Sequence, residues 1–433
     1  MSFAVFVAVQ FAVPRARWNG TRAFGPGNIA MLLFTVQLLV LPVLLATGGP
    51  SDGDLLVVPE DHAINVAMML QALAYAGYAA GYAIPAPVPR PSRLIGSPSR
   101  MAWYAGLFLA VGLFGLVLAF PTPGDLIAYF SGQGDVFLTE GPSTLGDAAA
   151  SFFRPFLPFA ILIVLAVRIA RREPRTLTLG DVALGVLAVL ASATNDYNRA
   201  SVAVPVLALL TAYSCTVRRL KMAHVVVAAL LLVGLAYQFG EYRSVYMATQ
   251  GGRISATDAG ITGQDSGFLD SLQLYANGPQ FWGTVVQEVE LSGYRGGETL
   301  VGSALLPVPV LGEPYRADSG PVEYNKLIYG RPGVDDQVIG FGAELYWNFG
   351  APAVALGYLL LGLGVRRFDD LLSGTRDPLA SYCWAYCGIW LALLTINSIS
   401  VVSQIAVYFG WPVLALVLAA RLFPHPRVPE VQR

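Results

Sequence analysis

Long apolar runs alternate with short polar segments along most of the chain. Ten of the runs approach the roughly 20 residues that cross about 30 Å of hydrocarbon as a helix. They predict spans at 29–47, 62–84, 101–120, 153–170, 179–195, 199–214, 222–240, 340–363, 379–397 and 401–420. The short apolar stretch 2–13 predicts an eleventh span only if the bilayer thins around it. The pattern predicts an all-α polytopic integral membrane protein with ten or eleven transmembrane helices.

Composition agrees with this pattern and excludes several classes of protein. Of 433 residues, 55% are hydrophobic and 13% are charged, whereas a soluble domain carries about 25% charged residues. The sequence lacks a phosphate-binding loop, a dinucleotide fingerprint and zinc-ligand spacing. The three cysteines lack the spacing of a disulfide framework. We therefore expect no cofactor, no metal and no nucleic-acid partner.

The connecting loops differ in charge, which predicts their sidedness. Six segments hold 19 of the 27 Lys and Arg residues: 14–28, 85–100, 168–178, 215–221, 364–377 and 421–433. Basic loops face the cytoplasm in multi-pass proteins. The other side then holds 22 of the 28 acidic residues and eight basic ones: Arg154, Arg199, Arg243, Arg253, Arg295, Arg316, Lys326 and Arg331.

The longest polar segment, 241–338, falls on the predicted outer face. It divides the chain into an N-terminal bundle (1–240), this loop, and C-terminal helices with a short cytoplasmic tail (339–433). Its length is too great for a simple connector. Capping residues and prolines predict short helices on the membrane surface that begin near Ser266, Pro279 and Ser319, with a turn at Gly296-Gly297.

Arginines are unusual on the predicted outer face, so we expect each to have a specific anionic partner there. Arg154 and Arg199 lie at the predicted membrane boundary, and Arg243 follows the end of a span. A guanidinium binds phosphate through paired hydrogen bonds, so these three could grip the phosphates of a lipid headgroup. The alternative is that they snorkel to ordinary lipids or pair with Asp196 and Glu241.

Glu344 lies several residues inside an apolar, glycine-rich run. A carboxylate at such depth faces a cavity or a partner, and burial raises its pKa. We therefore predict Glu344 as a general base for a hydroxyl group. The alternative is that it neutralises one of the arginines.

Aromatic residues are frequent in the same outer segment, among them Tyr242, Trp282 and Tyr315. Their rings suit the apolar faces of sugars, but tyrosines also form the aromatic belt of any membrane protein. The segment holds no histidine. A mechanism that needs a histidine base in this loop is therefore excluded.

These motifs follow a recognisable order. NDYNR ends one hairpin, a later span ends in EYR, the outer segment contains GGETLVGSALLPVPVLGEPYR, and ELYWNFGAPAVALGYLLLG follows it. Over about 180–365 this layout resembles the oligosaccharide repeat unit polymerases of the O-antigen polymerase (Wzy) family. The resemblance implies a GT-C-like glycosyltransferase of the bacterial inner membrane, whose substrate is an undecaprenyl-diphosphate-linked oligosaccharide.

The resemblance also implies roles for particular residues. Arg199 and Arg243 would hold the diphosphate or a sugar, while Arg295 and Arg316 would contact the acceptor. The remaining predicted substrate-binding residues are Arg154, Asp196, Glu241, Tyr242, Trp282 and Tyr315. Besides membrane lipids, a chain-length regulator and a flippase are the expected partners. The O-antigen ligases are similar in layout but use a histidine in the large loop, which this chain lacks.

Two other functions remain open from the sequence. A transferase that uses a polyprenyl monophosphate sugar would need acidic pairs in the first outer loop, where Asp52, Asp54, Glu60 and Asp61 occur. A flippase or transporter without enzymatic activity would tend to show paired inverted repeats. No such symmetry is visible in the sequence.

Overall fold

The computed structural model describes the chain in eleven stretches: 2–12, 24–48, 59–85, 94–131, 145–172, 175–195, 199–218, 276–308, 312–315, 317–329 and 339–422. Within them every regular element is a helix, which confirms the all-α prediction. Six helices in these stretches are long and apolar enough to cross a membrane: Pro26–Thr47, Asp61–Ala83, Ser99–Ala119, Leu145–Ala170, Ala351–Gly374 and Pro378–Thr395. Three shorter apolar helices accompany them: Leu179–Ala193, Ala200–Thr216 and Trp411–Leu422. The fold is compatible with a polytopic membrane protein.

The described helices occur in the following order along the chain. The N-terminal half contains α1 (Ser2–Ala12), α2 (Pro26–Thr35), η3 (Val36–Val40), α3 (Leu41–Gly48), α4 (Asp61–Ala83), α5 (Pro98–Ala119), α6 (Pro123–Ser131), α7 (Leu145–Phe153), α8 (Phe156–Ala170), α9 (Leu179–Ala193) and α10 (Arg199–Thr216). The C-terminal half contains α13 (Pro279–Ser292), α14 (Glu298–Leu305), η5 (Glu313–Tyr315), α15 (Gly320–Tyr329), α16 (Phe341–Phe349), α17 (Ala351–Gly374), α18 (Pro378–Ala392), η6 (Leu393–Thr395), α19 (Ile399–Gln404), η7 (Ile405–Phe409) and α20 (Trp411–Leu422).

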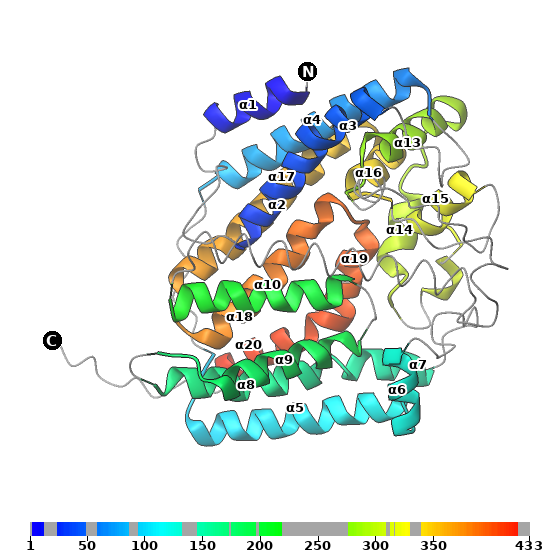
Figure 1. Cartoon of the computed structure of the whole chain (residues 1–433). Coiled ribbons are helices and arrows are strands. Elements are labelled where there is room, and N and C mark those ends of the chain that lie inside the picture. The colour runs from blue at the N-terminus through cyan, green and yellow to red at the C-terminus, as the bar shows by residue number, and fades with distance from the viewer. Residues whose placement is uncertain are drawn as a thin grey trace.

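The long helices form two groups with α10 and α18 between them (Figure 1). In one group α4 packs along α17, and in the other α5 and α9 pack against α8. Small residues bring α4 and α17 close together, since a Cβ on Gly81 would lie 2.0 Å from the Leu359 carbonyl oxygen. Such contacts are typical of membrane helices, where close van der Waals packing replaces the hydrophobic effect. Helices α13 to α16 gather at one end of the bundle (Figure 1).

Large apolar side chains also cover outward faces of the bundle. On α5, Trp103, Phe114 and Val117 are more than half exposed, and on α9 so are Val186 and Leu190. Exposed apolar area costs about 25 cal/mol per Å² in water. The same faces carry no such cost against lipid tails, so this surface fits a membrane protein.

The predicted span 340–363 is wrong in its boundaries. The structure divides it into α16 and α17, which meet at Gly350 with a φ of +77°. Only glycine adopts this backbone conformation without strain, and its position in the apolar run hid the break. Helix α17 then continues to Gly374 through residues that we predicted as a cytoplasmic loop. The charges there support a helix, because Arg366 and Asp370 form an ion pair one turn apart.

Other predicted spans also differ from the structure. The predicted spans 179–195 and 199–214 correspond to the shorter apolar helices Leu179–Ala193 and Ala200–Thr216, which are not among the six of spanning length. The run 401–420 is divided into α19, η7 and α20, with Gly410 between the last two. The first helix, α1, has 11 residues and is not among the six of spanning length. The predicted span 222–240 lies outside the described residues.

The segment 241–338, which we predicted on the outer face, is described from residue 276 onward, with gaps. Helices that begin at Pro279 and Gly320 confirm two of the predicted starts, while the start near Ser266 lies outside the described residues. Helix α13 does not lie free on a surface, because it packs against α4 and most of its side chains are buried. This part of the segment is therefore joined to the bundle.

Candidate functional site

An open cleft of about 800 Å³ lies among the helices at the end of the bundle. One guanidinium, two carboxylates and two aromatic rings line it, together with a glycine turn and two aliphatic side chains: Arg295, Glu298, Asp318, Tyr315, Phe349, Gly296, Gly297, Leu300 and Val301. Two predicted residues, Arg295 and Tyr315, therefore meet in one site. In the described part of the chain, no group of three or more His, Cys, Asp or Glu side chains is placed to hold a metal ion.

Arg295 is held in the wall of this cleft by several weak contacts. Its guanidinium lies 3.8 Å from a carboxylate oxygen of Glu288 and 3.8 Å from one of Glu323. The guanidinium carbon is 5.4 Å from the centre of the Trp347 ring, a cation–π contact. The guanidinium makes no hydrogen bond to any described residue, and its side chain is 35% exposed. Its Nε is buried without a partner, so the two terminal nitrogens are the ones open to an anionic or hydroxyl-bearing ligand.

Asn348 fixes the turn that forms the floor of the cleft. Its side-chain oxygen accepts a hydrogen bond of 2.9 Å from the Gly297 amide, and its amide nitrogen donates to the Thr299 hydroxyl at 2.6 Å. Gly296 and Gly297 both have positive φ, 63° and 103°. The predicted Gly296-Gly297 turn is confirmed, and its conformation requires glycine at both positions.

Glu344 lies on α16, is fully buried and is not among the residues that line the cleft. Its Oε1 accepts a hydrogen bond from the Ser303 hydroxyl, and its Oε2 accepts one of 3.1 Å from the Ile399 amide. Burial raises the pKa of Glu344 to about 7, and these two hydrogen bonds oppose the rise. Among the described residues no cation pairs with Glu344, so the predicted neutralisation of an arginine is not seen there. Its zero exposure keeps it away from a ligand in the cleft and favours a positioning role over that of a base.

Arg154 lies at the break between α7 and α8 and contacts the end of α9. Its Nη1 donates a hydrogen bond of 2.6 Å to the carbonyl oxygen of Thr194. A cation at a helix C-terminus also interacts favourably with the helix dipole. This contact places Arg154 at the C-terminal end of α9, and Arg199 begins α10.

Several predicted residues cannot be placed in the site. Nothing is described of the side chain of Arg199, and five residues lie outside the described residues: Asp196, Glu241, Tyr242, Arg243 and Arg316. Trp282 is described and is 1% exposed. It packs so closely on α16 that a Cβ on Gly342 would lie 2.0 Å from its ring. Trp282 is therefore part of the core, not of the cleft wall.

Comparison of the chain with protein-family models, with curated proteins and with solved structures finds no match. The function is therefore argued from the residues of the cleft. Sequence reasoning did not single out four of them, Glu298, Asp318, Leu300 and Val301. The two acids lie in a segment with many acids, so only the fold distinguishes them.

Proposed function

We propose that the chain is a membrane glycosyltransferase that polymerises undecaprenyl-diphosphate-linked oligosaccharide repeat units into a cell-surface or exported polysaccharide. The cleft that joins Arg295 to two carboxylates and two aromatic rings carries this proposal. It lies at one end of a bundle that is compatible with a membrane, where a lipid-linked substrate is within reach. The protein would lie in the bacterial plasma membrane with this end on the outer face.

The cleft has the side chains that sugars need. Tyr315 is 43% exposed and Phe349 is 52% exposed, so both rings are open to the apolar face of a sugar. The carboxylates of Glu298 and Asp318 can accept hydrogen bonds from sugar hydroxyls. A site of this composition suits an oligosaccharide better than a wholly apolar ligand.

The reaction would move a glycan from one lipid to the next repeat. The hydroxyl oxygen of the new repeat attacks the anomeric carbon of the growing glycan, and the bond to the carrier's diphosphate breaks. The hydroxyl proton passes to a carboxylate of the cleft, and the diphosphate leaves with the electron pair. Arginines stabilise the negative charge that develops on it. In this proposal Arg199 and Arg243 contact the diphosphate, and Arg295 and Arg316 contact the acceptor.

A deletion strain tests the proposal in cells. Without the chain, single lipid-linked repeats should accumulate on the outer leaflet, whereas repeats trapped inside would indicate a flippase. Arg295→Ala should lower polymer formation by about 100-fold, the scale on which one stabilising donor acts. Arg171→Ala, at an exposed arginine that ends α8, is the matched control and should restore polymer. Normal polymer from Arg295→Ala would contradict the proposed site.

A further inference from the structure

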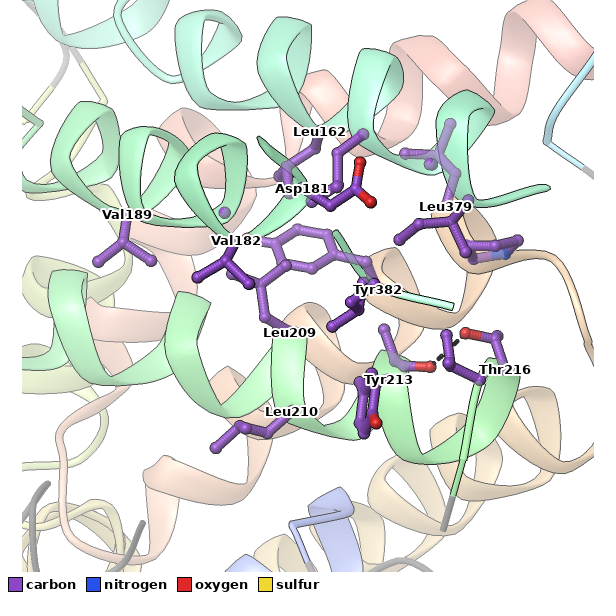
Figure 2. Close-up of a pocket in the computed structure, with 18 of the residues that line it drawn as sticks. Leu162, Asp181, Val182, Val189, Leu209, Leu210, Tyr213, Thr216, Leu379 and Tyr382 are labelled. Atoms are coloured by element: carbon purple, nitrogen blue, oxygen red, sulfur yellow. Dashed lines mark hydrogen bonds between the residues drawn. The ribbon is translucent and has the colours of Figure 1, made fainter. Parts of the chain in front are cut away.

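A second cavity, of about 460 Å³, lies among α8, α9, α10 and α18 (Figure 2) and shares no lining residue with the cleft. Its wall is mostly apolar, with Leu162, Val182 and Leu209 near the ring of Tyr382, and the carboxylate of Asp181 also lines it (Figure 2). Val182 is 49% exposed, so the cavity opens on the outer surface of the bundle. An apolar hollow on a surface that faces lipid admits a hydrocarbon chain.

One end of this cavity is marked by arginines. Arg175 donates hydrogen bonds to the carbonyl oxygens of Thr216, which lines the cavity, and of Arg376. Arg376 is two residues from the lining residue Pro378, and Arg218 directly follows the lining residue Val217. Three guanidinium groups therefore belong to the chain segments that meet at this end.

The charge of these arginines is not neutralised within the described residues. Asp181 pairs with Arg168 and Arg172. No carboxylate of the described residues forms an ion pair with Arg175, Arg218 or Arg376. Asp377 lies next to them but caps α18 and accepts from the backbone amides of Leu94 and Ile95. The cavity thus has an apolar body, and three arginines belong to the chain segments at one end of it, although none of them is among its lining residues.

We propose that this cavity binds an anionic phospholipid, with one acyl chain in the apolar body and the phosphate among Arg175, Arg218 and Arg376. Basic pockets between membrane helices favour such head groups, since a guanidinium binds phosphate bidentately. A zwitterionic lipid brings an ammonium group that the three arginines repel. The arginines lie at the opposite ends of α8 and α9 from the Arg154–Thr194 contact, and Arg199 begins α10 directly after that end of α9.

Lipids retained by the purified full-length chain test this proposal. The chain would be purified in mild detergent from cells that contain phosphatidylglycerol, and its lipids measured by mass spectrometry. Its melting temperature would then be compared with added phosphatidylglycerol and added phosphatidylcholine. We expect phosphatidylglycerol to be retained at least about 10-fold over phosphatidylcholine, and to raise the melting temperature as any ligand of the native state does.

Two variants separate the apolar body from the cationic end. Gly185→Phe should fill the cavity, because a Cβ at Gly185 has only Leu209 nearby, at 3.8 Å. Gly106→Phe is its control on α5, where a Cβ meets nothing within 4 Å. Arg218→Gln combined with Arg376→Gln removes two exposed charges, with exposed Arg421→Gln as control. Each test variant should retain about 10-fold less phosphatidylglycerol than the wild-type chain, and each control should retain the wild-type amount.

Several results would overturn the proposal. These are no retained phospholipid, equal retention of the two lipids, or a polyprenyl phosphate in place of phosphatidylglycerol. Unchanged retention in the double arginine variant would do the same, even if Gly185→Phe fails to fold. Polymer formation in cells is not used as a readout, so failure here is distinguishable from failure of the proposed glycosyltransferase activity.

Discussion

Glu344 accepts a hydrogen bond of 2.5 Å from the hydroxyl of Ser303, and the same hydroxyl accepts one of 2.9 Å from the Gly320 amide. The contact joins α16 to α14 and to the start of α15. Leu300 and Val301 of α14 and Asp318, just before α15, line the cleft. The shape of the cleft therefore depends on a buried carboxylate that does not line it.

The stability of the fold should depend on pH through Glu344. Burial raises its pKa from the ordinary 4.5 to about 7, so the folded chain holds this proton more tightly than the unfolded chain. That stability is fully present below about pH 4.5 and is lost as the pH rises to about 7. At 1.36 kcal/mol per pKa unit the loss is on the order of 3 kcal/mol.

Glu344→Gln supplies the control for this prediction because glutamine does not titrate. The melting temperature should be measured for the wild type and for Glu344→Gln across this pH range. As the pH rises from 4.5 to 7, the melting temperature of the wild type should decrease relative to that of Glu344→Gln. Parallel curves for the two proteins would show that Glu344 titrates normally.

Gly320→Ala should destabilise the protein and disturb the cleft. A Cβ at Gly320 would lie 2.3 Å from Oε1 of Glu344, and overpacking of this kind costs roughly 1–3 kcal/mol. Gly106→Ala is the control, since its Cβ would meet nothing within 4 Å and alanine favours a helix. Thermal unfolding in detergent measures both. Equal melting temperatures for Gly320→Ala and the wild type would mean that α15 shifts without cost.

The sequence predicted best where an apolar run is uninterrupted. The predicted span 62–84 corresponds to α4 at Asp61–Ala83. It failed at Gly350, because a single glycine in an apolar run gives no signal of a change in direction. It failed again after residue 363, because charged residues there looked like a loop although Asp369 is buried and accepts hydrogen bonds from the Gly27 amide and Tyr82.

The cleft was predictable only in part. Arg295 was predicted as a site residue because it carries a positive charge in a segment rich in acids. The turn was predicted from the pair Gly296-Gly297. Phe349 follows the segment 241–338 in the sequence, and it lines the cleft because α16 ends there, at the break before Gly350. The depth of Glu344 was predicted, but its role depends on Ser303 and Ile399, which are distant in sequence.

Arg199→Ala and Arg243→Ala should each abolish polymer while the chain is still expressed. Loss of a contact to the diphosphate removes stabilisation of the transition state, which should lower the rate of polymerisation by a factor of about 100 or more. Polymer length on a gel, with expression checked by immunoblot and Arg421→Ala as control, measures this. Polymer of normal length in both variants would remove the diphosphate contact from the account.

The sidedness of the cleft can be measured with engineered thiols. In a background where Cys215, Cys383 and Cys387 are replaced by alanine, Leu291→Cys gives a thiol at a position that is 78% exposed near the cleft. An impermeant maleimide should label it on intact spheroplasts, whereas Ser373→Cys at the end of α17 should react only after lysis. The reverse pattern would place the cleft in the cytoplasm.

Polymerisation by the purified chain is the most direct measurement. Liposomes that contain the full-length chain would be given undecaprenyl-diphosphate-linked single repeats, extracted from cells in which the chain is deleted. We predict a ladder of longer glycans that forms without nucleotide sugars, is lost with Arg295→Ala and is retained with Arg171→Ala. Repeats that stay single with the wild-type chain, or a ladder that Arg295→Ala leaves unchanged, would contradict the account.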